Sequence, residues 1–193
     1  GDKSKKINVG PNESMSKSKK NTIDPEKIIE NFGADAARLF ILSDSPPDKD
    51  VQWSEDGIVS AYKFVQKMWA LHVKFQNEIE KKHKNDSSNK VLKFTSLFIK
   101  KVTKNLESFS YNIIIANIHE MYSFFYKELT KNYKRETLIE NYAKILTVIT
   151  PILPHFSSEA LELLGFKNNL KWPTYDEKIL IESKVKIVVQ ING

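Results

Sequence analysis

The sequence predicts a mainly α-helical protein, in which an antiparallel helix bundle follows a small α/β segment. Apolar residues recur at steps of three and four through most of the chain, which is the period of a helix with one buried face. The alternation typical of a strand is found only near the two ends, in KINVG at residues 6–10 and in KVKIVVQING at residues 184–193. The bulk of the fold is therefore expected to be helix packed on helix.

Composition limits the class of protein. Hydrophobic residues make up 40% of the 193 positions, which is ample for a buried core. The absence of cysteine excludes disulfides and cysteine-ligated zinc, and the four scattered histidines predict no other metal site. The formal charge of +6 favours a polyanionic partner. No apolar run approaches the roughly 18 residues that span a bilayer, so we expect a cytoplasmic protein without a membrane partner.

The first helices carry clear start and stop signals. Asp24 is a predicted N-cap, with Pro25 at the first helical position, and Gly33 suits the end of the helix over residues 25–32. A more apolar helix over residues 34–44 is expected to end before Pro46 and Pro47.

Ser54 is the predicted N-cap of a helix of about 28 residues, which is too long for a minimal domain and suits a bundle. Three more helices are expected between residues 91 and 149, and a short one ends at Gly165. The apolar stripe of the long helix is predicted to contain Ile58, Tyr62, Val65, Trp69, His72 and Ile79. Among the histidines, His72 is expected to be a hydrogen-bonded core residue and His155 a structural residue. The tryptophans Trp53, Trp69 and Trp172 are expected to be packing residues.

The stretch SMSKSKKN at residues 14–21 places three lysines and three serines just before the first helix. A solvated polar tail has this composition, and so does a loop that holds a polyphosphate. A second basic region, residues 74–104, carries nine lysines against Glu78, Glu80 and Asp86, a local charge of +6. Contacts to nucleic-acid phosphates would use such a surface, and so would a simply solvated helix face.

Three segments together resemble one enzyme family. SMSKS at residues 14–18 resembles the KMSKS signature of class I aminoacyl-tRNA synthetases, with Ser14 in place of the first lysine. Residues 23–58 resemble the stretch that follows this signature in bacterial leucyl-tRNA synthetases. They contain, in order, Ser45, Pro46, Pro47, Asp50, Trp53 and Ser54. TPILPHFSSEALELLG at residues 150–165 resembles the proline-histidine turn of the helical anticodon-binding domain in the leucyl, isoleucyl and valyl enzymes.

The resemblance implies the chemistry of the loop. It implies that Ser14, Met15, Ser16, Lys17 and Ser18 contact ATP, and that Lys17 is the catalytic cation that meets the charge on the departing pyrophosphate. Met15 is expected to pack the loop against the core. The substrate is expected to be ATP with Mg²⁺, no metal site is expected within these residues, and the reaction is the ligation of leucine to tRNA(Leu) through leucyl-adenylate.

The resemblance also implies a division of the chain. Residues 1–53 would be the end of the catalytic core, residues 54–182 the helical anticodon-binding domain, and residues 183–193 the first strand of a further domain. We expect a fragment of a monomeric ligase, inactive alone because the leucine pocket lies outside it. The alternatives are a fragment of an isoleucyl- or valyl-tRNA synthetase and a stand-alone helical RNA-binding protein.

Overall fold

The computed structural model describes residues 11–44, 46–81, 89–131, 133–166 and 171–180. Two short helices, α1 (Pro25–Phe32) and α2 (Ala34–Asp44), lead into a long helix, α3 (Glu55–Ile79). Three further helices, α4 (Asn89–Glu107), α5 (Tyr111–Glu128) and α6 (Arg135–Ile149), complete a bundle with α3. The shorter helices α7 (Pro154–Leu163) and α8 (Glu177–Leu180) follow.

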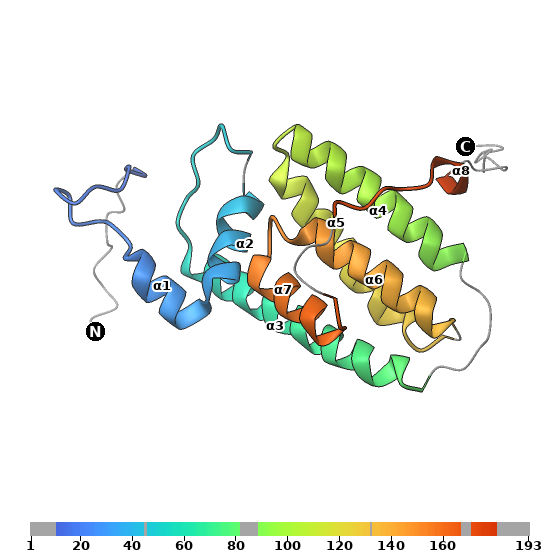
Figure 1. Ribbon diagram of the computed structural model, residues 1–193. Coiled ribbons are helices and arrows are strands. Elements are labelled where there is room, and N and C mark those ends of the chain that lie inside the picture. Colours follow the sequence, from blue (N-terminus) through green and yellow to red (C-terminus); the bar gives the residue numbers. More distant parts are fainter. Residues whose placement is uncertain (1–10, 45, 82–88, 132, 167–170, 181–193) are drawn as a thin grey trace, which may run out of the picture.

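Consecutive helices of the bundle run in opposite directions, which confirms the predicted antiparallel architecture (Figure 1). Helix α4 packs against both α5 and α6, while α2 packs across α3, α5 and α7 at one end. No strand occurs in the part of the chain that the structure describes. Both predicted strands lie outside the described residues.

The helix boundaries follow the local signals in the sequence. Asp24 caps α1 by accepting a hydrogen bond from the Glu26 amide at 3.1 Å, with Pro25 at the first helical position. Ser54 caps α3 by accepting from the Gly57 amide at 3.1 Å. Gly33 ends α1 with a φ of 80°, a conformation that favours glycine. These three predictions are confirmed.

Aromatic rings fill the centre of the bundle. The rings of Phe75 and Tyr142 are stacked with centroids 4.2 Å apart, and Phe125 lies against both of them. All three side chains are fully buried. These contacts join α3, α5 and α6 into one core, because each helix supplies one ring.

The buried face of α3 differs from the predicted stripe. Tyr62 and Val65 are only half-buried, and Trp69 is 39% exposed. The helix is packed not only by α2 but also by α1, α5, α6 and α7, so its buried surface is broader than a single stripe. The buried residues of α3 are Ile58, Ala61, Phe64, Met68, Leu71, His72, Phe75 and Ile79.

Two polar side chains of α2 attach it to the turn before α7 and to the start of that helix. The Asp35 carboxylate accepts hydrogen bonds from the His155 amide at 3.2 Å and from the Phe156 amide at 2.7 Å, and it lies 3.0 Å from His155 Nδ1. Arg38 Nε donates to the Ile152 carbonyl oxygen at 3.3 Å. His155 is therefore a structural residue, as predicted, because it stands at the N-terminus that Asp35 caps.

Candidate functional site: the loop at residues 14–21

The candidate site is a tight turn just before α1, at the end of the molecule opposite α8 (Figure 1). The Lys19 amide donates to the Ser16 carbonyl oxygen, and the Lys20 amide donates to the Lys17 carbonyl oxygen, each at 3.2 Å. Lys20 has a φ of 53°, which lets the chain reverse direction there. The loop therefore has a defined shape rather than that of an extended tail.

Asn21 holds the two sides of this loop together. Its Oδ1 accepts a hydrogen bond from the Ser16 amide at 2.8 Å, and its Nδ2 donates to the Ser14 carbonyl oxygen at 3.3 Å. One amide side chain thus bonds backbone groups five and seven residues before it, in the manner of an asparagine at a turn. The sequence interpretation missed Asn21, although an asparagine next to a lysine-serine turn is itself a turn signal.

The serines stabilise the turn internally. Ser16 Oγ lies 3.2 Å from Ser18 Oγ and accepts a hydrogen bond from the Lys19 amide at 3.3 Å. Both hydroxyls therefore take part in hydrogen bonds within the loop. Each still has a lone pair or a proton that can form a hydrogen bond with a ligand. Met15 is 48% exposed and does not pack against the core, so that expectation is wrong.

The lysines of the loop differ in their partners. Lys19 Nζ forms an ion pair with Glu13 Oε2 at 2.9 Å. Lys17 is exposed, and within residues 11–44 and the other described ranges no carboxylate is recorded within ion-pair distance of it. A lysine in this position can bind an anion from solution without first breaking an ion pair to a carboxylate of the described residues.

The second basic region is partly neutralised by the fold. Four of its nine lysines face carboxylates: Lys81 pairs with Glu78, Lys90 with Glu128, Lys100 with Glu177 and Lys101 with Glu120. Three of these carboxylates come from residues beyond 104, so the count over residues 74–104 overstates the charge available to a nucleic acid. Burial opposes the charged form of Glu128, but hydrogen bonds from Lys90, Tyr133 and Lys131 outweigh it and lower its pKa to about 2.

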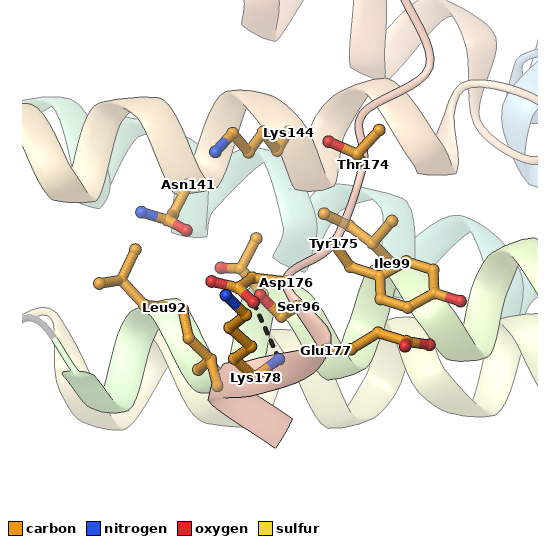
Figure 2. Close-up of a pocket in the computed structure, with 12 residues that line it drawn as sticks. Leu92, Ser96, Ile99, Asn141, Lys144, Thr174, Tyr175, Asp176, Glu177 and Lys178 are labelled. Atoms are coloured by element: carbon orange, nitrogen blue, oxygen red, sulfur yellow. Dashed lines mark hydrogen bonds between the residues drawn. The ribbon is translucent and has the colours of Figure 1, made fainter. Parts of the chain in front are cut away.

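A cavity of about 600 Å³ lies between α4, α6 and residues 174–179. Figure 2 shows the side chains that line it. Lys144 and Asn141 line it from α6, and the Lys178 amide donates to Asp176 Oδ1 at 2.9 Å across the start of α8. Its two lysines are balanced by Asp176 and Glu177. The cavity is consequently less suited to a polyphosphate than the loop around Lys17.

A second cavity, of about 730 Å³, lies among α1, α2, α3 and α7. Trp69, Phe32 and Val65 line it together with His155. This position explains why Trp69 is partly exposed.

Trp172 is 42% exposed, and its Nε1 donates to Thr103 Oγ1 at 3.0 Å. Trp53 packs as expected, edge-on to Phe40 at 5.2 Å. Trp69 also packs as expected, since its ring lies 5.5 Å from that of His72 and 6.4 Å from that of Phe156.

The fold and the loop define a class of protein, a helical bundle that carries a serine- and lysine-rich loop before its first helices. Residues 88–193 match the model of the anticodon-binding domain of tRNA ligase, and residues 10–54 match that of class I tRNA synthetases (I, L, M and V). The first match covers more than half of the chain. The chain therefore belongs to the family of the anticodon-binding domain of tRNA ligases.

Individual relatives of the chain are leucine–tRNA ligases. The chain is 36% identical over 197 residues to the leucine–tRNA ligase of Wolbachia pipientis subsp. Culex pipiens (strain wPip), an alignment that covers 99% of this chain and 24% of the relative. It is 39% identical over 198 residues to the leucine–tRNA ligase of Orientia tsutsugamushi (strain Boryong), with 97% and 22% covered. The chain thus spans about a quarter of the length of these curated relatives.

A solved structure supports the fold. The chain superposes with a TM-score of 0.77 on the crystal structure of the ternary complex of Agrobacterium radiobacter K84 agnB2 LeuRS-tRNA-LeuAMS. The match covers 86% of this chain and 23% of that chain, at 23% sequence identity. No helix in the described parts of the chain is both long and apolar enough to cross a membrane.

Proposed function

We propose that this chain is part of a leucine–tRNA ligase, which joins leucine to tRNA(Leu) through leucyl-adenylate. The observation that carries the proposal is the shape of the loop: Asn21 closes it, and Lys17 is exposed without a carboxylate partner among the described residues. The matches to leucine–tRNA ligases over 97–99% of the chain support the choice of amino acid.

The chemistry explains why an unpaired lysine is useful. When a carboxylate attacks the α-phosphate of ATP, pyrophosphate leaves and negative charge grows on the oxygen that bridges the α- and β-phosphates. We assign Lys17 to this charge, because a cation on a flexible stem meets it more closely in the transition state than in the ground state. We assign Ser14, Met15, Ser16 and Ser18 to the ATP-contacting surface of the loop, with ATP entering as its magnesium complex.

The roles of the parts follow the same proposal. Residues 1–53 contribute the loop to the catalytic core, residues 54–182 form the tRNA-binding helical domain, and residues 183–193 begin a further domain. The leucine pocket is supplied by residues outside this chain. We place the ligase in the cytoplasm as a monomer, and we expect the 193-residue chain alone to be inactive in ligation.

The test is leucine-dependent ATP–pyrophosphate exchange by a full-length ligase that contains this sequence. Lys17→Ala should slow exchange by about 100- to 1000-fold, as loss of a transition-state charge contact does in other enzymes. Lys19→Ala is the matched control, since Lys19 is two residues away and already paired with Glu13. Equal, small effects of the two changes would contradict the assignment of Lys17. Exchange driven by isoleucine or valine instead of leucine would support the alternative ligases.

A further inference from the structure

One side of the bundle combines exposed rings with lysines. On α5, His119, Tyr122 and Tyr126 are spaced by three and four residues and therefore share one face of the helix. On α3, Lys67 and Lys74 are seven residues apart and also share a face. We call these five residues, with Phe64 beneath them, the α3–α5 face.

Contacts between the two helices hold the rings in place. The rings of Phe64 and His119 lie with centroids 3.8 Å apart, and Tyr122 contacts Phe64 edge-on at 5.9 Å. Tyr126 stacks beside Tyr122 at 5.9 Å and is 55% exposed. The outermost ring, that of Tyr126, thus rests on Tyr122 and is more than half exposed to solvent.

The lysines are part of the same arrangement. Lys74 Nζ lies 4.3 Å from the centroid of the Tyr126 ring, a cation–π contact. Lys67 is close enough to His119 to act on its ionisation: burial, and to a smaller extent the charge of Lys67, lower the pKa of His119 and favour its neutral form. The face therefore presents neutral rings flanked by positive charge.

Negative charge is directed away from this face. The carboxylates of the described parts of α3 and α5 are located at helix ends or toward α4, where Glu120 pairs with Lys101 and Glu128 with Lys90. Glu55 and Asp56 lie in the first turn of α3, and Glu78 pairs with Lys81 in its last turn. The charge pattern of the face is complementary to a polyanion.

Building on the proposed function, we propose that the α3–α5 face binds RNA. An unpaired base takes the place of the Lys74 ammonium over the Tyr126 ring, and Lys67 and Lys74 contact the phosphates on either side of that base. Aromatic rings accept any base on their faces, and lysines beside them bind the backbone without reading sequence. This combination is suited to an unpaired nucleotide of a folded RNA. It places the RNA contact on α3 and α5 rather than on the lysines of α4, three of which are paired with Glu128, Glu177 and Glu120.

The experiment measures binding of a tRNA(Leu) transcript to the complete 193-residue chain by fluorescence anisotropy at several salt concentrations. Tyr126→Ala should weaken binding by about 5- to 100-fold, the usual range for losing one stacked base. Tyr126→Phe keeps the ring and should bind like the original chain. Lys74→Ala should lower the slope of log affinity against log salt by about one. Lys144→Ala, an exposed lysine on α6, is the matched control and should change the affinity much less.

A blunt RNA duplex without unpaired bases separates stacking from phosphate binding. On the duplex, Tyr126→Ala should bind like the original chain, while Lys74→Ala should still reduce the salt slope. If Tyr126→Ala and Lys144→Ala change the affinity for the transcript equally, the α3–α5 face is not the RNA contact. That result would leave tRNA binding by the chain itself unaffected. If the unmodified chain does not bind the transcript at all, the tRNA-binding part of the proposed function fails as well.

Discussion

His72 and Tyr142 lie with nearly parallel rings, centroids 5.9 Å apart, in the centre of the bundle. Both side chains are fully buried, and among the described residues neither the two ring nitrogens of His72 nor the Tyr142 hydroxyl has a hydrogen-bond partner. The sequence predicted a core histidine at this position, which is confirmed, but it also predicted a hydrogen bond, which is wrong. A buried imidazole without a partner is costly to protonate.

His72 should make the stability of the protein depend on pH. Burial lowers the pKa of His72 from 6.5 to about 4, so the unfolded chain binds its proton first as the pH falls. The free energy of unfolding should therefore drop between pH 6.5 and pH 4, by up to about 3 kcal/mol. Urea unfolding at several pH values measures this. His72→Phe keeps an aromatic ring and should flatten that part of the profile; an unchanged slope would contradict the role of His72.

Asp35 should be important for the attachment of α7. Asp35→Ala removes the acceptor of two amide hydrogen bonds at the start of α7, so it should lower the free energy of unfolding by about 2–3 kcal/mol. Asp35→Asn keeps an acceptor oxygen and should cost less. Chemical denaturation of the three proteins compares them. The two amides bond different carboxylate oxygens, so equal losses for Ala and Asn would show that a single acceptor oxygen does not hold α7.

Gly57 allows α2 to approach α3. A Cβ at residue 57 would lie 2.5 Å from Phe40 Cε2, and the Phe40 ring is buried against Trp53. Gly57→Ala should therefore destabilise the protein by about 1–2 kcal/mol, because the free-energy cost of overpacking exceeds the gain from the higher helix propensity of alanine. Thermal unfolding measures the change. Adding Phe40→Leu should make the Gly57→Ala change less harmful than it is alone, whereas additive losses would contradict a clash between these two residues.

Asn21 should keep the loop in its observed shape. Asn21→Ala removes the acceptor of the Ser16 amide and the donor to the Ser14 carbonyl oxygen, so exchange of the Ser16 amide hydrogen should be faster. Amide exchange followed by NMR on the 193-residue chain measures this directly. Asn12→Ala is the control, since Asn12 bonds the side chain of Gln52 instead. Equal exchange of the Ser16 amide in the original chain and in Asn21→Ala would show that this hydrogen bond does not determine the loop.

Features governed by near neighbours could be predicted from the sequence. Asp24, Gly33 and Ser54 act on groups within four residues, and their roles as caps or helix ends are confirmed. The bundle was also predictable, since the period of apolar residues determines helices and their buried sides. The ends of the chain were predicted as strands, and those segments lie outside the described residues.

Features that depend on distant parts of the chain could not be predicted in this way. The lysines of α4 appeared free in the sequence, but Lys100 and Lys101 meet Glu177 and Glu120, which belong to other helices. The exposure of Trp69 depends on how α1 and α7 surround α3. The roles of Ser14, Met15, Ser16, Lys17 and Ser18 in ATP binding stay a prediction, and the loop's own hydrogen bonds are what the structure adds to it.

The link between α2 and α7 has a consequence for synthesis of the protein. Asp35 leaves the ribosome about 120 residues before the amides that it caps, so α2 first exists with a carboxylate that only water can satisfy. Burying that carboxylate early would be unfavourable, which should delay the docking of α2 onto α3 and α5 until Phe156 has emerged. Helices α1 and α2, which connect the loop to the bundle, would then be synthesised first but would be among the last to pack against the rest of the protein.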